Sequence, residues 1–265
     1  MKARVKNRIV LCFKILFCSC FIILNPSCGL DEYYVLSPPS SIHTPIYSST
    51  NTISYENRYF EFTTDENRYY DDKGFTFQGT AVYYKLYSNL STCESEYKAL
   101  NTMVNTDSTK ANAATSMINS YKFQPMQNLY SDDDVLIPHT SSEAFQTVRI
   151  RLTQYLDNQN EFDFVAQISI FRNGDYSFIG VPARYYGDRQ FDFYRNNTAT
   201  GFYAPIPRTT SYEDDVSTST SVTKDNIWYI TLFAVGQGYD ASFTSYYSTI
   251  EYLGTLAIDA SSSDN

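Results

Sequence analysis

The sequence contains few of the residues on which catalytic and metal sites commonly depend. Histidine occurs only twice, at His43 and His139, and both lie beside prolines in segments that we expect to form loops. No serine lies in a Gly-x-Ser-x-Gly turn, and the chain has no Walker motif, no Gly-x-Gly-x-x-Gly motif and no cysteine pair with zinc spacing. Because a serine or cysteine nucleophile needs a base within reach, these absences disfavour a histidine-dependent hydrolase. We expect neither a cofactor nor a bound metal.

The N-terminal segment lacks acidic residues. Residues 1–27 contain five basic residues, and from Ile9 to Leu24 the chain is apolar apart from Lys14 and Ser19. This order is typical of a secretory signal peptide. An uncleaved membrane-spanning helix is the alternative, but spanning needs about 20 predominantly apolar residues. The run here is shorter and ends at the turn dipeptide Asn25-Pro26, so a cleaved signal peptide is favoured.

The residues around Cys28 resemble the lipobox of bacterial lipoproteins. Leu24 stands four places before the cysteine and Ser27 directly before it, while Asn25 and Pro26 fit the relaxed pattern of spirochaetal lipoproteins. The resemblance implies that the signal peptidase cuts before Cys28, whose thiol then carries a diacylglycerol and whose amine is acylated. Two or more acyl chains give stable anchoring where a single chain is marginal. An ordinary cysteine that follows an apolar run is the alternative.

Loss of the signal peptide changes both the charge and the cysteine content. Removal of the five basic residues takes the formal charge from −9 to −14 over the remaining 238 residues, enough for one large domain or two small ones. An acidic surface disfavours nucleic acid and anionic lipid headgroups as partners. With Cys28 acylated, Cys93 is the one cysteine left, so no intramolecular disulfide can form. We expect Cys93 to be a small buried residue, with a reactive or intermolecular thiol as the alternative.

Aromatic residues suggest strands. The chain has 25 Tyr and 18 Phe, and both types favour half-buried strands. Neighbours in a strand point to opposite faces, so each Tyr-Tyr doublet is expected to place one ring in the core and one at the surface. The doublets are Tyr33-Tyr34, Tyr69-Tyr70, Tyr83-Tyr84, Tyr185-Tyr186 and Tyr246-Tyr247.

Strand-like segments alternate with turn signals along the chain. The segments that begin at Asn57 and Phe75 are predicted to form an antiparallel pair, with a bulge or bend at Gly79. Asn173-Gly174 predicts a tight hairpin. Further strands are expected in residues 147–156, 163–172, 175–181, 189–195, 226–236 and 246–258.

The spacing of apolar residues becomes helical after residue 90. Ser91 and Glu94 match a capping box, and a second helical set runs from Ala111 to Tyr121. We therefore predict a helical hairpin at about residues 91–122, with one apolar face on the sheet. A long loop from Gln124 to Ser142 is expected next.

The aromatic strands resemble a known architecture. The segments "TAVYYKLYS", "IWYITLFAVGQGYD" and "YYSTIEYLG" look like the central and last strands of a fibronectin type III or immunoglobulin-like sandwich. A lipobox, a Pro-Pro segment, a "VYYK" strand and a terminal "YLG" strand also recur in uncharacterised spirochaetal lipoproteins. The resemblance implies a mainly β fold, an antiparallel sandwich with a helical-hairpin insertion. Whether the middle of the chain completes one sandwich or forms a second small sheet stays open.

The expected domain order follows from these segments. Residues 1–27 are the signal peptide, residues 28–55 the lipid anchor and a tether rich in Ser, Thr and Pro, and residues 56–260 the sandwich domain with its insertion.

Acidic clusters are the remaining candidates for chemistry. They comprise Asp71-Asp72, Asp132 to Asp134 and Glu213 to Asp215, and "DNQNEFD" from Asp157 only weakly resembles a calcium loop. We interpret them as solvated loop charge.

The expected function is binding, adhesion or a structural role in a bacterial cell envelope, without catalysis. The partners are then the membrane, through Cys28, and an unidentified protein or glycan. Tyr185-Tyr186 and Phe202-Tyr203 are candidate contact residues, because Tyr and other aromatic rings present large areas with few rotatable bonds. The alternative is a cell-envelope glycan hydrolase that uses paired carboxylates. Which membrane and which face hold the protein is not encoded in any motif.

The lipid anchor can be tested directly. Replacing Cys28 by Ser is expected to release the protein from membranes and to abolish incorporation of a labelled fatty acid, because the acyl chains are attached through this thiol. Cys93→Ser serves as the control and is expected to leave both properties unchanged. Fatty-acid labelling that persists in the Cys28→Ser protein would contradict the assignment.

Overall fold

A computed structural model describes residues 36–45, 57–66, 74–140, 145–152, 155–156, 163–164, 166–185, 191, 214–217 and 227–259. All of them belong to the second of the two units into which the chain divides, Val35–Asn265. The predicted signal peptide, Cys28 and most of the predicted tether lie outside the described residues, as do Tyr33-Tyr34 and Tyr69-Tyr70.

The fold is mainly β, as predicted, and almost all strand pairs are antiparallel. A seven-stranded sheet is built around β3 (Phe75–Tyr87) and β14 (Ile227–Asp240). On the β14 side it continues with β15 (Ser245–Tyr247) and β16 (Glu251–Asp259), and on the β3 side with β4 (Gln124–Pro125), β6 (Ile137–Pro138) and the parallel β13 (Val216–Ser217).

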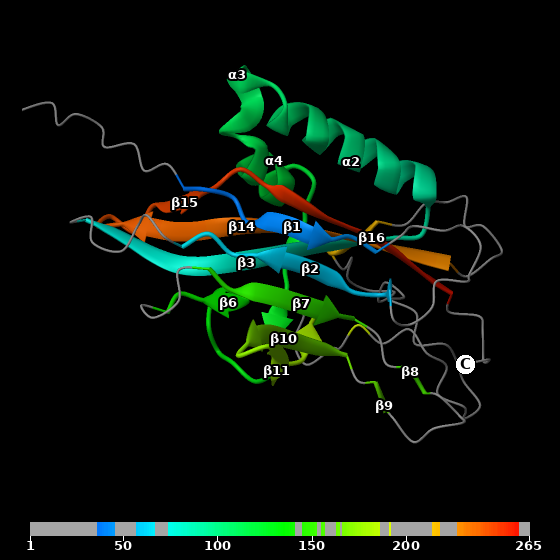
Figure 1. Ribbon diagram of the computed structural model, residues 1–265. Helices are drawn as coiled ribbons and strands as arrows, with labels where there is room; N and C mark the ends of the chain where they lie inside the picture. Colours follow the sequence, from blue (N-terminus) through cyan, green and yellow to red (C-terminus); the bar gives the residue numbers. More distant parts are fainter. Residues whose placement is uncertain are drawn as a thin grey trace, which may run out of the picture. The chain divides into compact units, whose positions relative to one another are not determined.

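A five-stranded antiparallel sheet packs against the first (Figure 1). Its order is β1 (Ser40–His43), β2 (Phe60–Thr63), β7 (Thr147–Arg151), β10 (Gln167–Arg172) and β11 (Asp175–Gly180). Two short pairs complete the described strands, β5 (Gln127–Asn128) with β12 (Pro182–Ala183) and β8 (Tyr155–Leu156) with β9 (Asp163–Phe164).

Three helices cover the other face of the seven-stranded sheet (Figure 1). They are α2 (Leu90–Val104), α3 (Asp107–Lys110) and α4 (Ala113–Asn119), between β3 and β4 in the sequence. Cys93, Leu100 and Met117 are their most buried larger side chains. The helical spacing thus predicted α2 and α4 and their buried residues, while the short α3 lies before the second predicted helical set and was not predicted.

Both faces of β3 are buried, so every residue from Gly79 to Tyr87 lies in the interior. Val82, Tyr84 and Leu86 pack between the two sheets. Tyr83 and Tyr87 pack under the helices. The prediction of one surface ring for each doublet is therefore wrong for Tyr83-Tyr84, because a second layer covers the face that a simple sandwich leaves to solvent.

The start of α2 differs from the predicted capping box. The Asn89 side chain is the N-cap and accepts a hydrogen bond of 3.1 Å from the Thr92 amide, while the Ser91 hydroxyl donates to the same Asn89 oxygen. Asn is as good a cap as Ser, so the N-cap lies two residues before the predicted Ser91. Glu94 instead pairs with Lys98 across one turn.

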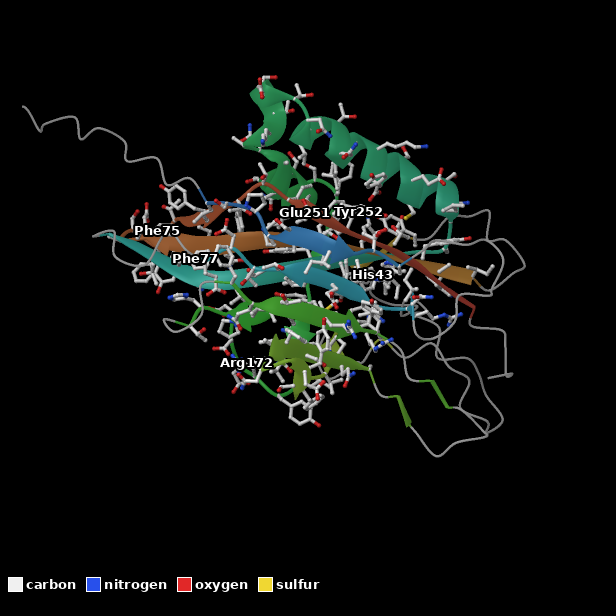
Figure 2. The ribbon with its side chains drawn as sticks, viewed as in Figure 1. His43, Phe75, Phe77, Arg172, Glu251 and Tyr252 are labelled. Atoms are coloured by element: carbon white, nitrogen blue, oxygen red, sulfur yellow. The ribbon has the colours of Figure 1, made fainter. Side chains whose placement is uncertain are left out.

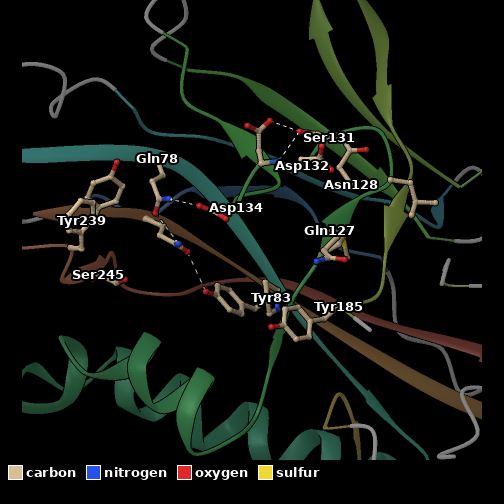
Figure 3. Close-up of a pocket in the computed structure, with 16 residues that line it drawn as sticks. Gln78, Tyr83, Gln127, Asn128, Ser131, Asp132, Asp134, Tyr185, Tyr239 and Ser245 are labelled. Atoms are coloured by element: carbon tan, nitrogen blue, oxygen red, sulfur yellow. Dashed lines mark hydrogen bonds between the residues drawn. The ribbon is translucent and has the colours of Figure 1, made fainter. Parts of the chain in front are cut away.

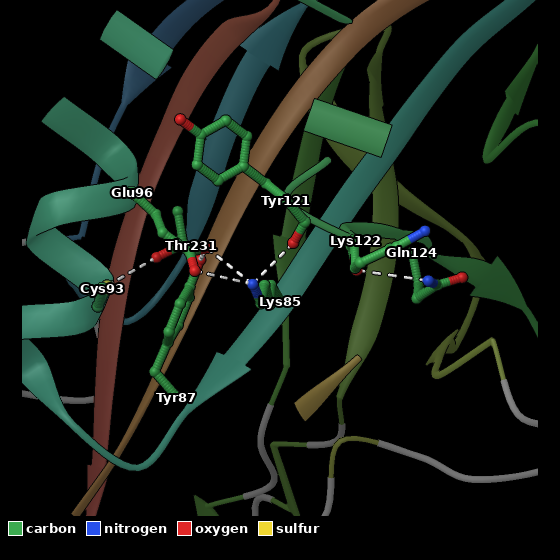
Figure 4. A network of polar contacts seen from close by, with 8 residues as sticks. All are labelled: Lys85, Tyr87, Cys93, Glu96, Tyr121, Lys122, Gln124 and Thr231. Atoms are coloured by element: carbon green, nitrogen blue, oxygen red, sulfur yellow. Dashed lines mark hydrogen bonds and ion pairs between the residues drawn. The ribbon is translucent and has the colours of Figure 1, made fainter. Parts of the chain in front are cut away.

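A partly buried ion pair connects the helical layer to the sheet (Figure 4). The Lys85 ammonium on β3 contacts both carboxylate oxygens of Glu96 on α2, at 3.0 and 2.8 Å, and donates to the Tyr121 carbonyl at 2.7 Å. Tyr87 donates a further hydrogen bond of 2.8 Å to Glu96. A polar contact at this depth allows one docking position of α2, because any other leaves the charges without partners.

The strand order departs from the prediction at β2. This strand pairs with β1 and β7, and not with β3, because Phe60 and Phe62 face the core between the sheets and complete the five-stranded layer. The hairpin at Asn173-Gly174 is confirmed; both residues have positive φ, 54° and 89°, as this two-residue turn requires.

Gly79 is the bend that the sequence indicated. Its φ is +135°, the register of β3 against β14 shifts beside it, and a Cβ would lie 2.2 Å from the Ile137 carbonyl oxygen. Only glycine allows the backbone of β6 to approach this closely. The bend therefore positions the loop that follows β4 beside β3 and β14.

Cys93 is buried and free, as predicted. Its sulfur lies 3.1 Å from the Thr231 hydroxyl on β14. Burial raises the pKa of the thiol, so the reactive thiolate form is disfavoured.

Asp215 contradicts the prediction of solvated loop charge, because it is fully buried. Its carboxylate accepts two hydrogen bonds from the Arg184 guanidinium, at 2.7 and 2.8 Å, and a third of 2.7 Å from the Tyr84 hydroxyl. Tyr84 in turn accepts from the Tyr185 amide at 2.9 Å. Asp71, Asp72 and Glu213 lie outside the described residues, as do nearly all of residues 189–195; Phe191, from that segment, is buried against Tyr84.

Asp215→Ala is expected to lower the free energy of unfolding by about 3–5 kcal/mol, because it leaves the Arg184 charge buried without its partner. Urea unfolding followed by circular dichroism measures the change. Asp214→Ala at the exposed neighbour is the control, expected within about 0.5 kcal/mol. The double variant Arg184→Met with Asp215→Leu is expected to recover most of the loss, and a single variant as stable as the parent would contradict the role of the pair.

Candidate functional site

A cleft of about 790 Å³ lies beside β3 and β14 (Figure 3). Its volume falls within the range of small-ligand sites, about 300–1,000 Å³. The two long strands contribute Gln78, Tyr83 and Gln237 to its lining. Further lining residues come from the segment between Pro125 and Asp134 and from the turn between Tyr239 and Ser245. Tyr185 lies at one end.

A chain of hydrogen bonds orients the polar side chains in the cleft (Figure 3). The Tyr83 hydroxyl donates to the side-chain oxygen Oε1 of Gln237 at 3.3 Å. The Gln237 amide donates to Gln78 at 3.1 Å, and Gln78 donates to Asp134 at 3.3 Å. Burial, and secondly Tyr247, raise the pKa of Tyr83, so its hydroxyl stays a donor. Both glutamine amides are thus held in a defined orientation, and each has a second N–H and a second acceptor site for a ligand.

The carboxylates of the cleft come from one loop. Asp132, Asp133 and Asp134 are exposed, as expected of solvated loop charge. Asp133 accepts a hydrogen bond from the Ser131 hydroxyl, and Asp134 accepts one from Gln78. The residues that line the cleft include these three acids and no Lys, Arg or His, so the cleft is electronegative.

An aromatic pair forms another part of the cleft wall. Tyr239 and Phe243 stack with ring centroids 5.6 Å apart and planes 24° apart. Phe243 is 80% exposed and has a φ of +62°, a region that bulky residues rarely adopt. The turn is held by Asp240, whose carboxylate accepts from the Ser242 and Thr244 amides at 2.9 Å each. The Ser242 hydroxyl also donates to this carboxylate, at 2.7 Å, and this bond, followed by that of the Thr244 amide, lowers the pKa of Asp240.

The structure brings together some of the residues that the sequence singled out and separates others. Tyr185 lines the cleft as a candidate contact residue. Tyr186, Phe202, Tyr203 and the segment from Asp157 to Glu161 lie outside the described residues. Sequence inspection missed Gln78, Gln237 and Phe243, because isolated glutamines in strands and one Phe in a turn carry no motif.

The two histidines have structural partners. His43 belongs to β1 and not to a loop (Figure 2). Its Nδ1 lies 2.9 Å from the Tyr59 carbonyl oxygen, and its ring stacks on Tyr59. His139 follows β6, and its Nδ1 lies 3.1 Å from the carboxylate of the buried Glu66.

A second polar cluster covers the outer face of the five-stranded sheet. The Arg149 guanidinium lies 4.2 Å from the Tyr59 ring centroid and 3.8 Å from that of Tyr176. Its nitrogens contact Glu61 at 2.6 and 2.7 Å, and Tyr176 donates to the same carboxylate. Because these groups bind one another, we interpret the cluster as a structural contact between neighbouring strands. The cleft is therefore the better candidate for a ligand site.

No grouping of side chains in the described part of the chain resembles a metal centre. No set of three or more His, Cys, Asp or Glu side chains there is arranged to hold an ion. The helices among those residues are also too short or too polar to cross a membrane.

Comparison with known proteins adds no name to this site. No family model matches the sequence, and no significant match is found among curated proteins or among solved structures. The function is therefore inferred from the residues of this chain alone.

The Glu66–His139 pair predicts a pH effect on stability. Burial is the largest effect on Glu66 and raises the pKa of its carboxyl above 4.5, although His139 acts in the opposite direction. The folded state then binds the proton more tightly than the unfolded state, so this group favours folding at acidic pH and the benefit is lost as the pH rises through the raised pKa.

Urea unfolding of the parent and of Glu66→Gln between pH 4.5 and 7 measures this effect, with those limits chosen around the ordinary carboxyl pKa of about 4.3. The parent is expected to gain stability relative to Glu66→Gln as the pH falls, and Glu94→Gln, at an exposed acid, is expected to show no such trend. A difference that is constant, or that shrinks with falling pH, would contradict the raised pKa.

Proposed function

We propose that the protein is a lipoprotein of a bacterial cell envelope, anchored through acyl chains on Cys28, and that its folded domain binds a partner in the cleft without catalysis. The anchor is supported by the basic, apolar and small residues before Cys28. An electronegative, polar cleft with fixed amides and exposed rings supports the binding role.

Phe243 is the observation that carries the binding role. An exposed Phe gains nothing from burial, and a left-handed backbone at such a residue costs about 1–3 kcal/mol. Both features occur together at the wall of the cleft, stacked on Tyr239. A ligand that covers the Phe243 ring would remove apolar surface from water and so offset the cost of its exposure. We therefore propose that the strained turn serves to present this ring to the ligand.

The arrangement of carboxylates favours binding over the rival hydrolase. Glycoside hydrolases place two carboxyl groups on opposite sides of the scissile bond, about 5–9.5 Å apart. The acidic residues that line this cleft are consecutive, Asp132 to Asp134, and belong to one loop. Asp133 and Asp134 also accept hydrogen bonds from Ser131 and Gln78.

For the fold we further propose an enlarged immunoglobulin or fibronectin III-like sandwich, with the helices inserted between β3 and β4. Two antiparallel sheets that share a core support this proposal. The helical cover on the second face of the larger sheet is the feature that such a sandwich would have gained.

Retention on envelope material tests the binding role. The purified full chain is sedimented with the insoluble, lipid-extracted envelope fraction of the producing cells. Phe243→Ala is expected to weaken retention about tenfold, equivalent to about 1.4 kcal/mol, because it removes an aromatic contact. Phe178→Ala is the matched control, since Phe178 is also an exposed Phe, at 55%, but lies outside the cleft.

Equal retention of Phe243→Ala and the parent would contradict binding in the cleft. Release of soluble reducing sugar from the same fraction, abolished by Asp134→Asn, would instead establish the hydrolase.

A further inference from the structure

We propose that the cleft binds an oligosaccharide without acidic groups. This inference rests on the binding role proposed above and names the class of ligand. Four features of the cleft support it: the order of its aromatic and polar groups, the hydrogen-bonding groups of its amides, its negative charge, and the pairing of the adjacent β3 edge with β4 and β6.

Aromatic rings and polar groups alternate along the cleft. Figure 3 shows Tyr239 and Ser245 at one end, Gln78 and Asp134 next to them, and the exposed Tyr185 toward the other end. The ring of Tyr83 between them is buried, and its hydroxyl donates to Gln237. A pyranose has the matching surface, an apolar C–H face and a rim of hydroxyl groups. Its C–H groups pack on the negative face of an aromatic ring, and its hydroxyls reach polar groups beside the ring. The alternation therefore fits a chain of two or more sugar units.

The fixed amides require a ligand that both donates and accepts hydrogen bonds. Gln78 and Gln237 orient each other, so their remaining N–H groups and oxygen lone pairs have defined directions. A hydroxyl group donates and accepts at once and matches both. An ammonium group only donates, so a polyamine leaves the amide N–H groups without acceptors, which is unfavourable.

The charge of the cleft excludes acidic saccharides. Asp132, Asp133 and Asp134 line it without a basic residue among the lining groups, on a chain of formal charge −9. A carboxylate or sulfate on the ligand would be repelled, and the repulsion grows as salt is lowered. The same carboxylates accept hydrogen bonds from neutral hydroxyls, and such charge-assisted bonds are stronger than neutral ones.

The strand edge beside the cleft disfavours a peptide. Peptides commonly bind a sheet by adding a strand to a free edge. Here β4 already pairs with Tyr83 and Tyr84 of β3, and β6 pairs with Gly79 and Thr80. The β3 backbone groups that an added strand would need here are therefore already occupied.

Calorimetry with defined probes tests the proposal on the full chain in a detergent without a sugar headgroup. The probes are the neutral tetrasaccharides of N-acetylglucosamine, glucose (both α-1,4 and β-1,4) and mannose, together with tetragalacturonate, spermidine and tetralysine. At least one neutral tetrasaccharide is expected to bind, and tetragalacturonate at least about tenfold more weakly than that probe.

Two glutamine variants show whether the amide chain is responsible. Gln237→Met keeps the size of the side chain and removes its hydrogen bonds, so it is expected to weaken binding of the neutral probe about tenfold. Gln167→Met, at a half-buried glutamine of β10 outside the cleft, is the matched control with unchanged affinity. Equal affinity of Gln237→Met and the parent would overturn the role of the amides.

The outcomes separate this inference from the function on which it rests. If spermidine, tetralysine or tetragalacturonate binds most tightly, or if no neutral probe binds while retention on envelope material still depends on Phe243, the ligand class is wrong and the binding role stands. If no probe binds and retention does not depend on Phe243, both proposals fail.

Discussion

The antiparallel pairing of β3 with β14 is the contact on which the other layers depend. Twelve residue pairs join the two strands, from Tyr229 with Tyr87 to Asp240 with Phe75. Because side chains alternate between the two faces, this pair supplies one apolar surface to the second sheet and another to the helices. The cleft lies beside the same strands, and its residues Gln78 and Tyr83 flank the bulge at Gly79.

Two ion pairs, one partly and one fully buried, connect the other layers to this strand pair. Lys85 binds Glu96 of the helical layer, and the carboxylate of Asp215 holds both Arg184 and Tyr84. Charges removed from water add little net stability even when paired, but a misplaced partner is strongly unfavourable. We infer that these pairs select one register of helix and loop on the sheet. Tyr185, next to Arg184, is thereby placed at the end of the cleft.

The candidate site is assembled from segments far apart in the sequence. Gln78, Asp134 and Gln237 share one hydrogen-bonded chain, although 159 positions separate the two glutamines. A ligand would therefore contact two rigid strands and two loops at once, and the strands hold the amides in place before binding. Preorganised donors and acceptors reduce the entropy lost on association.

The sequence by itself determined the periodic and local features. Alternation predicted a strand over residues 147–156, which contains β7, and strand-forming residues predicted one over 226–236, which covers most of β14. Asn173-Gly174 predicted the hairpin, and helical spacing predicted α2 and α4. The residues before Cys28 predict the lipid anchor. Only the tertiary structure decided that β2 pairs with β7, that both rings of Tyr83-Tyr84 are buried, that Asp215 is an interior charge, and that Gln78, Gln237 and Phe243 share a cleft. The physical reason is that periodicity and turn chemistry act over a few neighbouring residues, whereas strand partners, second layers and clefts depend on contacts between distant ones.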